Sequence, residues 1–281
     1  MRSKKNSQKI SVAIGIFDGV HLGHLHLIAR AHRVLTFNPH PVPGTVLLTT
    51  LEEKKALIGN LDVLKFNKRF YRLTPENFVK KDLLRRYDLE KIYVGADFRF
   101  GYKRSGDTKT LKILGKKYGF DVEVVPLQKI NGKVIKSSLI RQLIGLGKIT
   151  EAAKLLGREY YLMGKVVHGS NRGHKLGFPT INIKSLEGKC LPKLGVYAGD
   201  VVVKNHSYSC GINVGIRPTF NDSKPRVTVE ANLVGYSGGS LYGQKVLLRF
   251  KSFIRPEQKF KDIGALVRQI KKDMTLIKKL G

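Results

Sequence analysis

The order in which strand-like and helix-like segments follow one another constrains this fold most strongly, and that order changes at Gly157. Before Gly157, short apolar runs typical of buried strands alternate with segments of helical periodicity. The strand-like runs are 11–17, 34–37, 91–98 and 120–127. Strands that alternate with helices pair in parallel through right-handed crossovers. We therefore predict an α/β domain with a parallel sheet over residues 1–157.

The helix-like segments before this point carry start and stop signals of their own. Thr50 precedes a Leu-Glu-Glu run and predicts a helix that begins with a capping box. Residues 74–87 have a helical stripe of apolar side chains with a proline near its start. Residues 137–157 predict two helices separated by Gly147, the second capped by Thr150 and ended by the segment's last glycine.

After Gly157 the chain consists of short β runs punctuated by Gly, Asn and Pro. These runs are 160–169, 195–203, 207–215, 226–234 and 245–253. Such a series is typical of an antiparallel barrel or sandwich. Helical spacing returns over 260–280. We predict a second domain, residues 158–281, that is an antiparallel β-barrel closed by a C-terminal helix.

Charge is the one extreme feature of the composition. The formal net charge is +31. Residues 1–157 hold 30 basic and 13 acidic residues, and residues 158–281 hold 22 and 8, so the excess is spread over both parts. No basic arm or interleaved aromatic series points to single-stranded nucleic acid. We expect anionic small ligands as partners and keep a nucleic-acid-binding protein as an alternative.

The compartment is predicted from what the chain lacks. No apolar run approaches the roughly 20 residues of a membrane span, and the basic start is not followed by the apolar core of a secretory signal. Two cysteines are too few for a disulfide framework or a four-cysteine zinc site. We expect a cytoplasmic protein, with no membrane partner, that is a monomer or a weak homo-oligomer.

The first chemical signal is GIFDGVHLGH, residues 15–24, which follows an apolar strand. Gly15 and Gly19 allow a tight turn and a close approach of the backbone to a ligand. If a helix begins near His21, then His21 and His24 share a face of its first turn beside free N–H groups. Two such donors suit a phosphate on which charge develops. The alternatives are a metal-binding histidine pair or two surface histidines.

The second signal is GKVVHGSNRGHKLGFPTINI, residues 164–183, which lacks the spacing of a P-loop. Thr180 and Asn182 are two residues apart on an extended segment, so their side chains point the same way. Hydroxyl and amide oxygens are ligands suited to Mg²⁺ beside nucleotide phosphates. The plainer alternative is an apolar strand. Glu230 lies on the polar face of an alternating strand, where its plainer alternative is an exposed carboxylate.

These segments resemble the bacterial bifunctional riboflavin kinase/FAD synthetases. GIFDGVHLGH is similar to the family's nucleotidyltransferase signature, and TFNPHP, VGADFRFG and KSSLIR follow in the family's order. The segment 164–183 resembles the riboflavin kinase signature GxVxxGxxxGRxLGFPTAN, with His174 in place of the arginine. The resemblance implies a Rossmann-like nucleotidyltransferase domain and a riboflavin kinase barrel. It also implies ATP as co-substrate, Mg²⁺, and riboflavin, FMN and FAD as substrates or products.

Site residues are carried over from this resemblance by position. For the adenylyltransferase, it implies that His21 and His24 are catalytic and contact the ATP phosphates, and that the other ATP-binding residues are Gly15, Phe17, Asp18, Ser137, Ser138 and Arg141. The implied flavin-binding residues are Asn38, Asp97, Phe98, Arg255 and Phe260. For the kinase, it implies Glu230 as the catalytic base and Thr180 and Asn182 as metal ligands. The implied ATP-binding residues of the kinase are Gly169, Gly173, Lys175, Gly177, Thr180 and Asn182.

One departure from the family concerns the connection 25–35. It is about half of a typical helix-plus-loop connection and close to the minimum for a crossover between parallel strands. Either the helix is truncated or the edge of the sheet is rearranged. The expected function is phosphorylation of riboflavin to FMN and adenylylation of FMN to FAD with release of pyrophosphate. The alternative from the same class is a riboflavin kinase whose adenylyltransferase is weak or lost.

Overall fold

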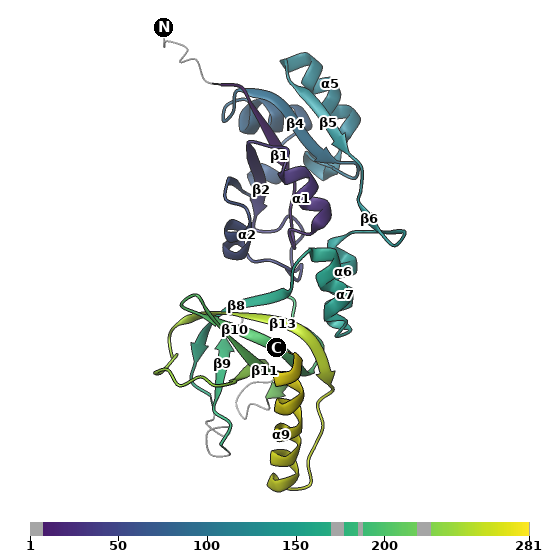
Figure 1. Ribbon diagram of the computed structural model, residues 1–281. Coiled ribbons are helices and arrows are strands. Elements are labelled where there is room, and N and C mark those ends of the chain that lie inside the picture. Colours follow the sequence, from purple (N-terminus) through teal and green to yellow (C-terminus); the bar gives the residue numbers. More distant parts are fainter. Residues whose placement is uncertain (1–7, 170–176, 185–187, 218–225, 281) are drawn as a thin grey trace. The chain divides into compact units, whose positions relative to one another are not determined.

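The chain forms two compact units in the computed structural model, which describes residues 8–169, 177–184, 188–217 and 226–280. The units are Met1–Ser137 and Ser138–Gly281, and each has a sheet of its own (Figure 1). Both cysteines are free and buried. Across the described ranges, no helix combines the length and the apolar character that crossing a bilayer requires.

A five-stranded parallel sheet in the order β3-β2-β1-β4-β5 forms the first unit. Its strands are β1 (Ile10–Ile14), β2 (Arg33–Asn38), β3 (Leu61–Lys65), β4 (Leu89–Gly95) and β5 (Asp121–Val125). The prediction of a parallel α/β sheet is confirmed. Strand β3 was missed because it is only five residues long and two of them, Asp62 and Lys65, are charged.

Short helices cover this sheet. They are α1 (Leu22–Ile28), α2 (Leu51–Leu57), α3 (Lys68–Tyr71), α4 (Pro75–Phe78), the π-helical turn η1 (Val79–Leu83), the 3-10 turn η2 (Tyr102–Arg104) and α5 (Thr108–Tyr118). Alternate residues of β1 enter separate cores: Val12 and Ile14 pack in one cluster, Ala13 in the other. Both faces of the sheet are therefore buried, as is typical of parallel sheets.

The short connection 25–35 is accommodated by a truncated helix. Helix α1 has 7 residues, and β2 still pairs in parallel with β1 from Val12↔Arg33 onward. The sheet order beside β1 is therefore the ordinary one. Of the two possibilities left open by the sequence, truncation of the helix is the one found.

The predicted helix signals are confirmed at Thr50 and corrected at Thr150. The Thr50 hydroxyl oxygen accepts from the Glu53 backbone N–H, and the Glu53 carboxylate accepts from the Thr50 backbone N–H. These two hydrogen bonds form the capping box of α2. Residues 137–157 form α6 (Ser137–Gly145) and α7 (Ile149–Leu156). Thr150 lies inside α7, whose N-cap is Lys148 without a side-chain hydrogen bond. The cap was placed wrongly because buried Ile149 already belongs to the helix's apolar face.

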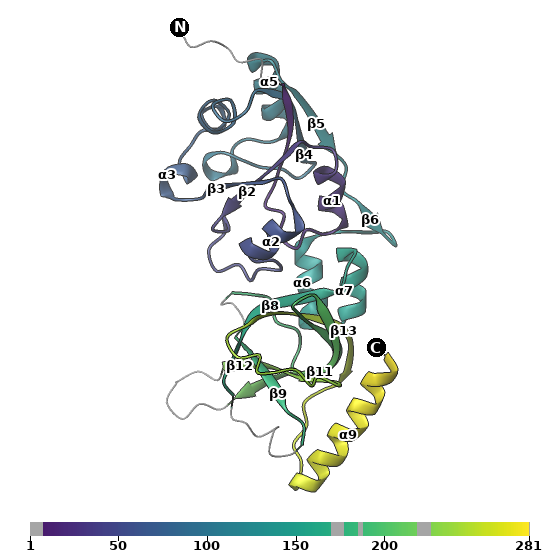
Figure 2. The same ribbon diagram turned by 60° about the vertical axis from the view of Figure 1, so that its left-hand side comes forward.

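A closed six-stranded barrel, in the order β10-β11-β12-β9-β8-β13, forms the second unit (Figure 2). Its strands are β8 (Tyr160–Val167), β9 (Thr180–Lys184), β10 (Gly195–Val203), β11 (His206–Arg217), β12 (Arg226–Leu233) and β13 (Lys245–Arg255). Every pairing between neighbours is antiparallel. The barrel prediction is confirmed over the sandwich, and FPTINI contributes a strand of its own. A small hairpin, β6 (Lys129–Ile130) and β7 (Lys133–Val134), belongs to the first unit.

Helices cover the outside of the barrel. Helix α7 packs against β8 and β13, and the C-terminal helix α9 (Ile263–Leu280) runs beside the barrel and packs on β11 and β10 (Figure 2). At Gly211 of β11, a Cβ would lie 3.0 Å from the Ile277 side chain and 3.1 Å from the Met274 sulfur. Helix α9 therefore packs closely on β11, where a larger residue than glycine would force the side chains to move.

Candidate functional site

The loops that carry the first motif cluster lie at one edge of the parallel sheet. Strands β1, β2 and β4 are neighbours and run in the same direction, so the segments after Ile14, Asn38 and Gly95 leave from the same edge. From β1 the chain continues to β2 and β3 on one side of β1 and then returns to β4 and β5 on the other side, so the strand order reverses at β1, which is a topological switch point. Open α/β sheets bind ligands at such an edge.

The turn after β1 has an unusual backbone. Phe17 and Val20 have φ of 50° and 39°, and Gly19 has φ of 87°. Non-glycine residues in this region carry strain that the surrounding packing must support. A Cβ on Gly15 would lie 2.9 Å from the Phe17 ring, which folds back on the strand end. Gly15 therefore makes room for Phe17, and Phe17 is buried in the protein core.

The two histidines stand together at the start of α1. His21 is the N-cap, and its Nδ1 accepts from the His24 backbone N–H at 3.3 Å. Their rings are stacked, with centroids 3.5 Å apart and planes 17° apart. The Phe17 and His24 rings are nearly perpendicular, with centroids 5.3 Å apart. The predicted helix start and the shared face are confirmed, and the two imidazoles form one unit that can present donors to a phosphate.

Asp18 is turned into the protein. It is 2% exposed, and its Oδ1 accepts from the backbone N–H groups of Leu48 and Thr49 at 2.9 and 3.1 Å. A buried carboxylate needs such donors. The Gly19 N–H in turn donates to Thr49 Oγ1 at 2.9 Å. Asp18 therefore fixes the histidine-bearing turn against the 48–50 segment.

Helix α6 begins at Ser137, the second residue of the KSSLIR segment. The Ser137 hydroxyl donates to the Asp18 carbonyl at 2.8 Å, so it holds the same turn from a distant part of the chain. Ser138 and Arg141 are three residues apart on α6 and belong to the second unit. At that spacing their side chains share a face of the helix.

Lys54 is a residue of this region that the sequence analysis missed. On α2, its ammonium donates to the Ile16 carbonyl at 2.6 Å and to Thr36 Oγ1 at 3.4 Å. Burial lowers the pKa of Lys54 to about 8, and the negative charge of Asp18 opposes that shift. The Thr36 hydroxyl donates to the same carbonyl at 2.9 Å. Together they fix the end of β1 to β2 and α2.

The residues expected near the flavin in this unit follow β2 and β4. Asn38 is exposed at the end of β2, and its peptide bond to Pro39 is cis. Asp97 is exposed in the loop after β4. The Phe98 ring stacks on Phe100 with centroids 5.4 Å apart and planes 19° apart. Phe98 thus lies at the margin of an aromatic core and is only partly buried.

The kinase residues of the second unit form a row across three barrel strands. Asn182 of β9 pairs with Glu230 of β12, and Glu230 pairs with Asn213 of β11. Directly paired residues project on the same face, with Cβ atoms roughly 4.5–5.5 Å apart. Thr180 pairs with Asn232 in the next row of that face. The structure therefore brings together the residues that the resemblance named and adds Asn213, which we missed.

Gly169 shows why this site needs a small residue. A Cβ there would lie 2.0 Å from Asn182 Nδ2, so the backbone at Gly169 lies directly against the amide. Gly177 has φ of 79°, a conformation that favours glycine. Gly173 and Lys175 lie outside the described residues. The described part of the predicted nucleotide loop is thus in contact with the Thr180–Asn182 strand.

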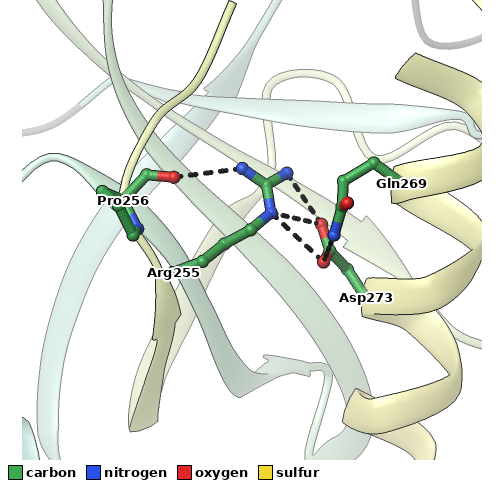
Figure 3. Close-up of polar contacts among 4 residues, drawn as sticks. All are labelled: Arg255, Pro256, Gln269 and Asp273. Atoms are coloured by element: carbon green, nitrogen blue, oxygen red, sulfur yellow. Dashed lines mark hydrogen bonds and ion pairs between the residues drawn. The ribbon is translucent and has the colours of Figure 1, made fainter. Parts of the chain in front are cut away.

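Arg255 and Phe260 lie at and after the end of β13. The Arg255 guanidinium carbon is 5.9 Å from the centre of the Phe260 ring. Arg255 also forms an ion pair with Asp273 of α9, at 2.8 Å between Nη2 and Oδ2 (Figure 3). The two predicted flavin residues are therefore in contact with each other and tied to the C-terminal helix.

The donor set of the row fits Mg²⁺ better than a soft metal. Among the described residues, no group of three or more His, Cys, Asp or Glu side chains is placed to hold a metal ion. Thr180 and Asn182 instead offer neutral oxygens on the face that carries Glu230. Hard oxygen ligands of this kind complement phosphate oxygens around Mg²⁺. The residues present are compatible with a metal delivered together with a nucleotide.

A parallel α/β sheet with paired imidazoles at its switch point, joined to a barrel with an amide–carboxylate–amide row, defines a two-domain transferase. Family models agree with this division. The FAD synthetase model matches residues 3–139, and the riboflavin kinase model matches residues 156–280.

Known proteins resemble the chain over nearly its whole length. A bifunctional riboflavin kinase/FMN adenylyltransferase of Buchnera aphidicola subsp. Schizaphis graminum is 36% identical, with 98% of this chain and 95% of the relative covered. One from Listeria monocytogenes is 34% identical, with 93% and 89% covered. A solved structure described as a macrolide-efflux protein from Streptococcus pneumoniae has a TM-score of 0.85 and 29% identity, covering 98% and 96%.

The chain belongs to the bifunctional riboflavin kinase/FMN adenylyltransferase family. Both family domains are present, which favours the bifunctional interpretation over a riboflavin kinase whose adenylyltransferase is weak or lost. It also favours an enzyme over the nucleic-acid-binding alternative. The resemblance recognised from the sequence motifs is confirmed.

Proposed function

We propose that this protein phosphorylates riboflavin to FMN and then transfers AMP to FMN, giving FAD and pyrophosphate, with ATP as the donor in both steps. The observation that carries the proposal is the presence of two separate sites in one chain. One is the stacked pair His21–His24 at the switch point of the sheet. The other is the row Asn182–Glu230–Asn213 on the barrel.

The kinase reaction is assigned to residues 158–281. Glu230 accepts the proton of the riboflavin 5′-hydroxyl as that oxygen attacks the γ-phosphorus of ATP and ADP leaves. Thr180 and Asn182 hold Mg²⁺, which when bound neutralises phosphate charge. Gly169, Gly173, Lys175 and Gly177 are assigned to ATP binding by position in the motif. Arg255 and Phe260 border the flavin. This assignment is supported by the shared face of Thr180, Asn182 and Glu230.

The adenylyltransfer is assigned to residues 1–157. His21 and His24 stabilise charge on the α-phosphate while the FMN phosphate oxygen attacks it and pyrophosphate leaves. Gly15, Phe17 and Asp18 shape the turn that carries them. Further residues are assigned by position, Asn38, Asp97 and Phe98 to the FMN and Ser137, Ser138 and Arg141 to the triphosphate. Support comes from the common sheet edge of the segments after β1, β2 and β4.

The proposal also covers the compartment, the oligomeric state and the partners of the enzyme. We place it in the cytoplasm, as a monomer or weak homo-oligomer, with riboflavin, FMN and ATP as partners rather than nucleic acid or a membrane. A net charge of +31 raises the local concentration of anionic substrates. Free, buried cysteines fit a reducing compartment.

The test is a product analysis with the purified full-length chain. Riboflavin, ATP and Mg²⁺ are supplied, and flavins are separated by chromatography over time. We expect FMN to appear first and FAD to follow. FMN without FAD above background would refute bifunctionality, and the absence of both products would refute the proposal as a whole.

A further inference from the structure

The C-terminal helix contributes a buried carboxylate that the proposed reactions do not use. Asp273 is 6% exposed. Its Oδ2 accepts from Arg255 Nε at 2.9 Å and from Arg255 Nη2 at 2.8 Å, and its Oδ1 accepts from Arg255 Nε at 3.2 Å (Figure 3). Such side-on, charge-assisted pairs fix the orientation of a guanidinium.

A neighbour on the same helix orients the carboxylate. Gln269, one turn before Asp273, donates from Nε2 to Asp273 Oδ1 at 2.8 Å. The third nitrogen of the guanidinium also has a partner, because Arg255 Nη1 donates to the Pro256 carbonyl at 3.1 Å (Figure 3). Arg255 is thus held between α9 and the backbone where the chain leaves β13.

The segment that begins at this point crosses toward the catalytic row. A Cβ on Gly215 of β11 would lie 2.3 Å from Glu257 Oε1 and 3.1 Å from Asn213 Nδ2. Glu257 therefore lies over β11 next to Asn213, which is the cross-strand partner of Glu230. The segment Pro256–Phe260 connects the ion pair on α9 with the strand beside the proposed base.

We propose that Asp273 is a positioning residue of the kinase site. It holds Arg255, and through Arg255 it seats the segment Pro256–Phe260 on the flavin side of the row. This inference rests on the proposed riboflavin kinase function. Docking of α9 does not depend on the pair alone, because Ile277 and Met274 pack closely on Gly211. Loss of the pair should therefore disturb the segment more than the helix.

The experiment compares Asp273→Asn with Asp200→Asn in the full-length protein. Asp200 is a matched control, since it is also 6% exposed and is ion-paired with Lys251 at 3.0 Å and Arg249 at 3.4 Å. We measure KM for riboflavin, KM for ATP and the rate of FAD formation from supplied FMN. Riboflavin binding is also titrated directly by flavin fluorescence.

For Asp273→Asn we expect KM and Kd for riboflavin to rise about tenfold, as for loss of a buried charge-assisted contact. KM for ATP and FAD formation from FMN should stay within about twofold of wild type, because the proposal assigns Asp273 to the segment Pro256–Phe260 and to neither ATP site. Asp273→Glu should recover part of the riboflavin affinity because it keeps the charge. Asp200→Asn should leave both KM values unchanged.

An unchanged KM for riboflavin in Asp273→Asn would overturn the inference. So would a finding that Asp273→Asn and Asp200→Asn change KM for riboflavin and KM for ATP to the same extent. If Asp273→Asn does not fold, Gln269→Ala replaces it, because this change keeps the ion pair and removes only the orienting hydrogen bond. A rise of about threefold in riboflavin KM is then expected, and no change overturns the inference. A wild-type protein that forms no FMN would instead refute the proposed function.

Discussion

Replacing Lys54 with Met tests whether the cost of burying the Lys54 ammonium makes the stability of the fold depend on pH. Burial lowers the pKa of Lys54 from 10.5 to about 8. At about 1.4 kcal/mol for each factor of ten in the ionisation equilibrium, this drop corresponds to about 3 kcal/mol. That energy is the net cost of keeping the charge in the fold at neutral pH, with the hydrogen bonds to Ile16 and Thr36 in place.

The direction of the pH dependence follows from proton binding in the two states. Between about pH 8 and 10.5 the unfolded chain keeps the Lys54 proton, whereas the folded protein releases it. Because the unfolded state binds more protons there, the stability of the wild type rises with pH. The unfavourable contribution is fully present below about pH 8 and disappears toward pH 10.5. Lys54→Met lacks this contribution at every pH.

Urea unfolding of both proteins between pH 7.5 and pH 10, followed by circular dichroism, measures the effect. We expect the free energy of unfolding of the wild type to rise relative to Lys54→Met by about 2 kcal/mol over this range. Lys55→Met is the control, because Lys55 is exposed on the same helix. A difference between wild type and Lys54→Met that stays flat or falls with pH would refute the reasoning.

Three further substitutions should each affect one site or one helix. Gly169→Ala places a Cβ 2.0 Å from Asn182 Nδ2, so KM for ATP in FMN formation should rise about tenfold or more; unchanged kinase kinetics would contradict the contact. His24→Gln should lower FAD formation from FMN about 100-fold, as for loss of one donor to a developing charge, and equal loss of FMN formation would count against the separate sites. Thr50→Ala removes the cap that pairs with Glu53 and should cost about 1 kcal/mol in urea unfolding, and no loss would mean that the cap is not needed.

The fold was largely predictable because strand and helix periodicities differ and are strong in this chain. Parallel strands buried on both faces read as apolar runs, and the alternation in 226–234 marked a half-buried barrel strand. Strand β3 was missed because LDVLK is short and contains the charged residues Asp62 and Lys65. Thr150 misled because a good capping residue stood two positions after the true N-cap.

The candidate sites were predictable only where residues lie close in sequence. The stacking of His21 on His24 follows from a spacing of three on one helix turn. Lys54, Asn213 and Asp273 were missed because each meets its partner through tertiary pairing, between α2 and Ile16, between β11 and β12, and between α9 and β13 respectively. A lone lysine, asparagine or aspartate carries no local signal for such contacts.

The central claim is that two independent sites in one chain catalyse successive steps. The most direct measurement follows flavin products of Glu230→Gln and of the double variant His21→Asn/His24→Asn. We expect Glu230→Gln to make no FMN from riboflavin but to convert supplied FMN to FAD. The double variant should accumulate FMN and make no FAD. Loss of both products in either folded variant, or retention of both in either variant, would contradict this account.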